Sequence, residues 1–107
     1  MKKEKLLPLT TPGEVLSEEL LKPLGLSEYK LAQALGVPRV RINGIVRGTR
    51  AISADTAYRL GQYFGMTPRF WLNLQSDYDL RRLERETALP KIGRCPAIPV
   101  KSAEIAL

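Results

Sequence analysis

One stretch near the middle of the chain, residues 28–48, constrains the fold more than any other. Its sequence, EYKLAQALGVPRVRINGIVRG, reads as two short helices joined by a tight turn. Gly36 can take the left-handed conformation that ends the first helix, and Pro38 suits the first turn of the second. Small or apolar side chains fall where such helices must touch, namely Leu31, Ala32, Leu35, Val37, Ile42 and Ile45. The stretch therefore predicts a helix-turn-helix unit.

The second of these helices carries a polar stripe. Arg39, Asn43 and Arg47 recur at one-turn intervals on the face opposite Ile42 and Ile45. A cationic face backed by a buried one is what a helix needs to enter the major groove of DNA. The arginine fork of Arg39 matches guanine O6 and N7, and Asn43 could pair with adenine or bridge to a base through water.

Two further positions on this helix bear on DNA recognition. Val40 could offer apolar contact to a thymine methyl group. Gly44 costs a helix about 1 kcal/mol relative to alanine, so its presence indicates a close backbone approach. The sequence leaves open whether DNA or another helix makes that approach.

Residues on both sides of the stripe are placed to contact phosphates, which would set register and give salt-dependent affinity. Arg47, Thr49, Arg50 and Ser53 would follow one strand, and Ser27 and Tyr29 the other. The alternative is that the arginines only form a solvated face. The full predicted DNA-binding set is Ser27, Tyr29, Arg39, Val40, Asn43, Arg47, Thr49, Arg50 and Ser53.

Charge and composition agree with a nucleic-acid partner. The chain has 107 residues, 17 Lys+Arg against 11 Asp+Glu, and a net charge of +6, which favours polyanions. Its hydrophobic fraction of 44% and charged fraction of 26% are those of an ordinary globular protein of one domain. Its partner could also be RNA, or the motif could serve protein packing alone.

Several function classes are disfavoured by residue counts. The chain has no histidine and one cysteine, Cys95, which excludes a histidine-based triad, a Cys/His zinc site and an internal disulfide. A ribonuclease would need groups that titrate near neutrality or a carboxylate cluster for a metal, and neither is evident. We therefore expect no enzymatic activity, no cofactor and no metal. Pro8 and two threonines interrupt the N-terminal apolar run, so we expect a cytoplasmic protein without a membrane segment.

Cap residues outline the other helices. Thr11, Pro12 and Glu14 form a capping-box start for a helix that should stop by residues 23–25. Ser27 should cap residues 28–35, Ser53 residues 54–64, and Thr67 a last helix to about Glu86. The prediction is an all-α, five-helix domain at residues 11–87. It is preceded by a flexible arm, 1–10, and followed by a flexible proline-containing tail, 88–107, which could add a short strand.

The last helix presents more apolar surface than so small a domain needs. Trp71, Leu72, Leu74 and Tyr78 are therefore predicted to form a dimer interface. A homodimer could set two recognition helices about 34 Å apart, in successive major grooves. The alternative for Trp71 is that it seals the core of the single chain.

Residues from about 12 to 80 resemble the HigA-type antitoxins, a branch of the lambda-repressor-like (Xre) helix-turn-helix proteins. The resemblance is carried by PGEVLSEELLKPLGLS, YKLAQALGVP, RINGIVRGTRAIS, ADTAYRLGQYFG and, most specifically, FWLNLQSDYDL. It implies a homodimer that binds a palindromic double-stranded operator, represses its own operon and neutralises a HigB-like mRNA-cleaving toxin. The alternative is a stand-alone repressor of the same fold without a toxin. No motif marks a toxin-binding surface, and the tail from residue 89 lies beyond the matched segment.

Overall fold

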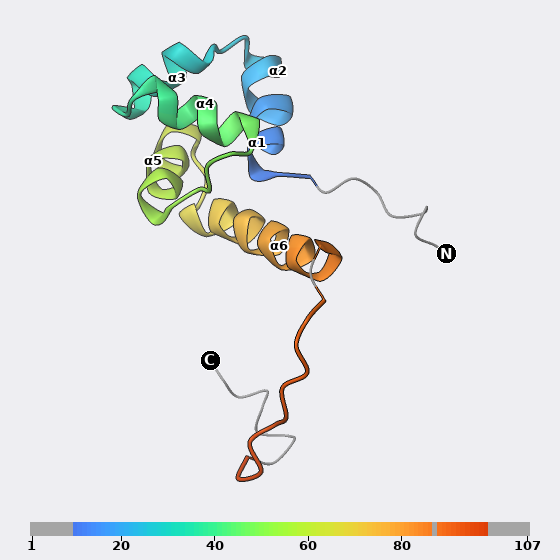
Figure 1. The fold of residues 1–107 in the computed structure, drawn as a ribbon. Coiled ribbons are helices and arrows are strands. Elements are labelled where there is room, and N and C mark those ends of the chain that lie inside the picture. Colours follow the sequence, from blue (N-terminus) through green and yellow to red (C-terminus); the bar gives the residue numbers. More distant parts are fainter. Residues whose placement is uncertain (1–9, 87, 99–107) are drawn as a thin grey trace.

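The computed structural model describes residues 10–86 and 88–98, and all the regular structure in these ranges is helical (Figure 1). The elements are α1 (Pro12–Val15), η2 (Leu16–Leu21), α2 (Lys22–Leu24), α3 (Glu28–Leu35), α4 (Arg39–Arg47), α5 (Ala54–Phe64) and α6 (Pro68–Glu86). Because α1, η2 and α2 follow one another without a break, they form one continuous helix. The predicted all-α, five-helix fold is confirmed. Nearly all of the predicted arm lies outside the described residues, as does 99–107.

Local caps set the helix boundaries. The Thr11 hydroxyl accepts from the Glu14 N–H at 3.0 Å, and the Glu14 carboxylate accepts from the Thr11 N–H at 2.9 Å. Ser27 and Ser53 accept in the same way at the starts of α3 and α5. Gly36 ends α3 at φ 72°, a left-handed conformation that favours glycine. Each of these caps was predicted. Pro38 lies one position earlier than expected, because it precedes α4 in extended conformation.

The first helix contains a wide π turn that the sequence did not predict. The Lys22 N–H donates to the Ser17 carbonyl, five residues back, across η2. The turn comes directly before Pro23, which has no N–H to donate and whose ring crowds the carbonyl four residues earlier. A wider turn relieves this crowding and lets the helix continue to Leu24, where Gly25 ends it.

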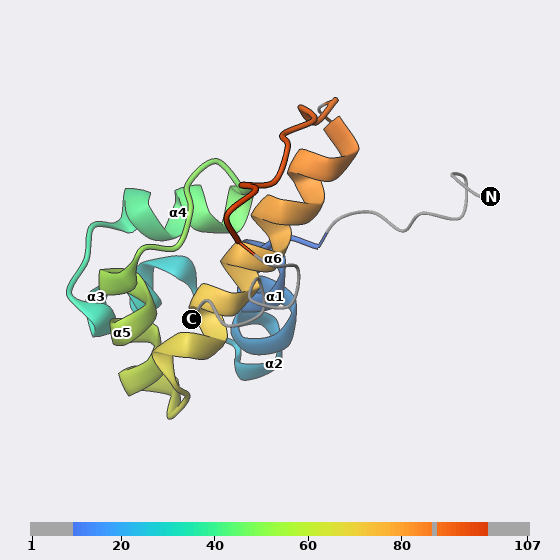
Figure 2. The ribbon, with the colours of Figure 1, turned by 90° about the horizontal axis from the view of Figure 1, so that it is seen from below.

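One apolar core joins all five helices. Its fully buried side chains are Leu16, Leu31, Ile42, Ile45, Leu60 and Trp71, and Ala57 lies among them. The helix α6 packs against α5 and α1, and in the view from below it passes in front of the first helix (Figure 2). The core thus holds α4 between the first helix and α3, with one long side left uncovered.

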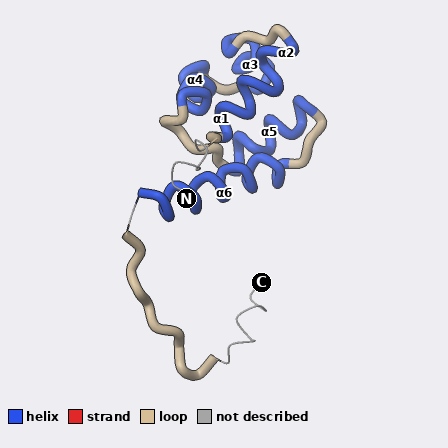
Figure 3. The backbone as a smooth tube through the Cα atoms, turned by 90° about the vertical axis from the view of Figure 1, so that its right-hand side faces the viewer, coloured by secondary structure: helices blue, strands red, loops and turns tan. Residues whose placement is uncertain are grey.

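Residues 88–98 form no helix or strand, and they follow α6 as an exposed loop (Figure 3). The short strand considered for the tail is therefore absent from this part of it. Cys95 is exposed in this loop and free. No helix in the described part of the chain has both the length and the apolar character needed to cross a membrane.

Candidate nucleic-acid interface

The helix α4 is buried along one side and open along the other. Ile42 and Ile45 are 0% and 1% exposed, whereas Val40 is 72% exposed. Because a helix turns by about 100° per residue, Val40 and Arg47 lie opposite the buried pair. Arg39 is also exposed, at the first turn. No described acidic residue forms an ion pair with either arginine, so both guanidinium groups are available on the open face.

Asn43 lies at the edge of this open face rather than at its centre. It is half-buried, and its Nδ2 donates a hydrogen bond to Oε1 of Glu28 at 3.0 Å. Glu28 is the first residue of α3, 15 positions earlier in the chain. The predicted stripe of three residues therefore has two free members and one that is held by the neighbouring helix.

The connector after α4 folds back on Gly44. The Gly44 carbonyl accepts from the N–H groups of Thr49 and Arg50 at 2.9 and 3.1 Å, and from the Thr49 hydroxyl at 3.3 Å. A Cβ at position 44 would lie only 3.1 Å from the Arg50 Cβ. The close approach that the sequence indicated at Gly44 is thus made by this connector. It places Thr49 and Arg50, both exposed, beside the end of α4.

Two contacts that sequence reasoning missed fix the far end of α4. Gly13 packs so closely that a Cβ there would lie 1.8 Å from the Ile45 carbonyl oxygen. The Ile52 N–H donates to the Gln75 side chain of α6 at 2.8 Å, which anchors the connector. No periodicity could have revealed these pairs, although glycine as the second residue of a helix was a local sign of close packing.

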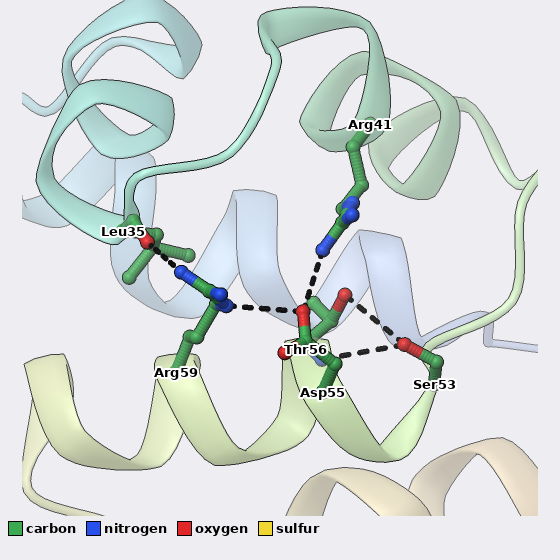
Figure 4. Close-up of polar contacts among 6 residues, drawn as sticks. All are labelled: Leu35, Arg41, Ser53, Asp55, Thr56 and Arg59. Atoms are coloured by element: carbon green, nitrogen blue, oxygen red, sulfur yellow. Dashed lines mark hydrogen bonds and ion pairs between the residues drawn. The ribbon is translucent and has the colours of Figure 1, made fainter.

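A polar network links the end of α3, α4 and the start of α5 (Figure 4). The Asp55 carboxylate accepts from Arg41 at 2.7 Å and from Arg59 at 3.0 Å. Arg59 also donates to the Leu35 carbonyl at 2.7 Å, at the end of α3. Hydrogen bonds from Arg41 and then Arg59 lower the pKa of Asp55 below its ordinary value. Among the described residues Arg41 therefore has an acidic partner, unlike Arg39 and Arg47.

The remaining predicted contact residues flank α4 on two sides. Ser27 and Tyr29 lie at the start of α3, both exposed, and the Tyr29 hydroxyl accepts from Gln33 at 3.1 Å. Ser53 lies at the start of α5 and is also exposed. The hydroxyl of each serine already accepts a hydrogen bond from a backbone N–H of the helix that it caps. A phosphate contact at either serine would therefore share that hydroxyl.

The predicted dimer residues differ in their exposure. Trp71 is 0% exposed, so it has no surface to offer a partner, and the prediction that it lies in an interface is wrong. Its ring fills the core of the single chain, as the alternative proposed. Leu72 and Leu74 are partly buried against that core, and Tyr78 is half-buried. The exposed leucines of α6, Leu80 and Leu83, were not singled out from the sequence.

The fold and the open cationic face define a DNA-binding helix-turn-helix protein. A family model described as "Helix-turn-helix" matches residues 18–71. The chain is 54% identical over 80 residues to virulence-associated protein I of Dichelobacter nodosus, covering 75% of this chain and 74% of that one. It is 45% identical over 75 residues to an uncharacterized HTH-type transcriptional regulator of Haemophilus influenzae, covering 70% of each.

A solved structure gives a more specific comparison. The Pseudomonas aeruginosa antitoxin HigA, determined with the higBA promoter, matches with a TM-score of 0.67 and 41% identity, covering 79% of this chain and all of that one. The chain belongs to the helix-turn-helix family, in the HigA-type antitoxin branch of the Xre proteins.

Proposed function

We propose that this chain is the antitoxin of a type II toxin-antitoxin pair, and that it binds its operator as a homodimer and represses its own operon. The observation that carries the proposal is the open face of α4, where Arg39, Val40 and Arg47 are exposed opposite a fully buried side. Support comes from the HigA relative whose structure was determined with promoter DNA. A face of this shape and charge suits a major groove.

Within this proposal the side chains divide into two groups. Arg39 reads guanine, Val40 meets a thymine methyl, and Asn43 contacts a base edge. Phosphate contacts along the flanking strands set register and supply salt-dependent affinity. They would come from Ser27, Tyr29, Arg47, Thr49, Arg50 and Ser53.

Binding can be tested on the promoter upstream of the gene. Arg39→Ala should weaken sequence-specific binding by about 1–3 kcal/mol in a gel-shift titration, because it removes a bidentate base contact. Arg69→Ala is the matched control, since Arg69 is an exposed arginine at the start of α6 rather than on α4. Equal binding by Arg39→Ala and the parent protein would show that the reading face is assigned wrongly.

The second part of the proposed function is neutralisation of a HigB-like mRNA-cleaving toxin. Family membership supports it. The measurement is co-expression with a short basic reading frame next to the gene, followed by co-purification, and growth after depletion of this protein. A stable complex and arrested growth on depletion are the expected results.

The alternative is a stand-alone transcriptional repressor of the same fold. It is favoured by the Haemophilus influenzae relative, whose description is that of a transcriptional regulator. Operator binding without a neighbouring toxin-sized reading frame, and normal growth after depletion, would establish the alternative. In both cases the α4 face performs the same DNA recognition.

A further inference from the structure

The hydrogen bond between Glu28 and Asn43 has a consequence for base recognition. A carboxylate only accepts hydrogen bonds, whereas an asparagine amide has a donating nitrogen and an accepting oxygen. The amide nitrogen of Asn43, not its oxygen, must therefore face Glu28, at the 3.0 Å separation between Nδ2 and Oε1. The direction of the amide is fixed by chemistry, because the opposite orientation would place two acceptors together.

This contact uses one of the two N–H groups of Asn43 and turns the amide nitrogen toward Glu28, so the carbonyl oxygen is the end of the amide that points away from Glu28. An unconstrained asparagine can present either end of its amide to a base edge. In the major groove, adenine and cytosine present an amino group, while guanine and thymine present a carbonyl oxygen at the corresponding place. An amide whose oxygen is the end turned away from Glu28 should therefore favour the two bases that donate.

The position of Glu28 is otherwise unfavourable for a DNA-binding surface. It follows Ser27 and precedes Tyr29, both assigned to phosphate contact, and a carboxylate there repels phosphates. Its negative charge does favour the N-terminus of α3, but any first-turn acid of that helix would do the same. The hydrogen bond to Asn43 accounts for the presence of a glutamate at this position.

We propose that Glu28 is a positioning residue for base selection: it holds the nitrogen of the Asn43 amide, so that Asn43 selects adenine or cytosine through its carbonyl oxygen. This inference rests on the proposed function, because it requires that α4 enters the major groove. It assigns to Glu28 a role in the choice of sequence rather than in affinity.

The test is selection of binding sites from randomised duplex DNA with the full chain and its variants. Wild-type protein should prefer adenine or cytosine over guanine and thymine at one base pair by on the order of tenfold. Asn43→Ala should lose the preference at that base pair alone. Glu28→Gln should reduce it to about twofold, because a glutamine amide can accept from or donate to Asn43 and so permits both orientations.

Two controls separate orientation from charge. Glu28→Asp keeps the charge but is one methylene too short for the contact, so it should relax the preference as Glu28→Gln does. Glu19→Gln removes an equal charge from an exposed position on η2 and should leave the preference unchanged. Thermal unfolding of each variant verifies that it is folded.

The outcomes are distinguishable. A wild-type preference for guanine or thymine at the Asn43 position, or an unchanged preference in both Glu28 variants, overturns the inference and leaves the proposed function intact. If wild-type protein enriches no sequence at all, the proposed function fails, and the inference fails with it.

Discussion

Asp55 links α5 to α4 through its ion pair with Arg41. The titration of Asp55 can be used to measure how much this ion pair contributes to stability. Its pKa is lowered in the folded chain by hydrogen bonds from Arg41 and Arg59. A lowered folded-state pKa gives stability that is complete above the unfolded-state pKa, ordinarily about 3.9 for aspartate. That stability is lost as the pH falls through the lower, folded-state pKa. The exposed site keeps the effect small, because solvent screens the pair.

We therefore predict that Asp55→Asn lowers the urea midpoint at neutral pH, and that the difference from wild type narrows in acid below the ordinary aspartate pKa. The measurement is urea unfolding across that range. Asp77→Asn is the control, because Asp77 is an exposed acid on α6 that pairs with no arginine in the described part of the chain. A constant difference between Asp55→Asn and wild type at every pH would contradict the assigned cause.

At the scale of the elements, the position of α4 in the fold depends on how closely the first helix packs against it. A Cβ at Gly13 would lie 1.8 Å from the Ile45 carbonyl oxygen and 2.9 Å from the Val46 Cα. Alanine normally stabilises a helix relative to glycine by up to about 1 kcal/mol. Here the collision is with backbone atoms that cannot rotate away, so the steric cost should exceed that gain.

Gly13→Ala should accordingly reduce the free energy of unfolding by about 1–3 kcal/mol, the usual range for overpacking. Operator affinity should fall as well, because α4 must move to relieve the contact. Gly93→Ala provides the comparison, since no atom lies within 4 Å of a Cβ at that position. If the two variants unfold at the same urea concentration, the first helix does not constrain α4.

The elements were largely predictable from sequence, whereas the contacts between them were not. The caps at Thr11, Ser27 and Ser53 act within three residues, so local pattern was enough to place the helix starts. Glu28 and Asn43 are 15 positions apart, and a surface acid has many partners open to it before the fold is known. The candidate face was found through its exposed arginines, but the contact that constrains its asparagine required the structure.

At the scale of the whole molecule, the C-terminal half of α6 lies beyond the core (Figure 1). Leu80 and Leu83 are 59% and 46% exposed there and, three residues apart, share one face of the helix. Leu72 lies on the same side at helical spacing and is partly covered by the core. We infer that these leucines, rather than Trp71, provide the apolar area for the proposed homodimer. A two-fold axis would bring each such patch against its copy.

Leu80→Glu combined with Leu83→Glu should convert the proposed dimer to a monomer. Each buried leucine contributes about 1.5–3 kcal/mol, so loss of the pair from both copies should weaken dimerisation by at least a hundredfold, roughly 3 kcal/mol. Both side chains are exposed in the single chain, so the fold should survive, as circular dichroism can verify. Sedimentation equilibrium gives the oligomeric state. Leu24→Glu is the control, because Leu24 is 61% exposed on α2.

Two recognition helices joined in a dimer bind both half-sites as one unit, so the monomer should also lose affinity for a full operator while keeping its affinity for a half-site. A double variant that stays dimeric would exclude this face of α6 as the dimer contact.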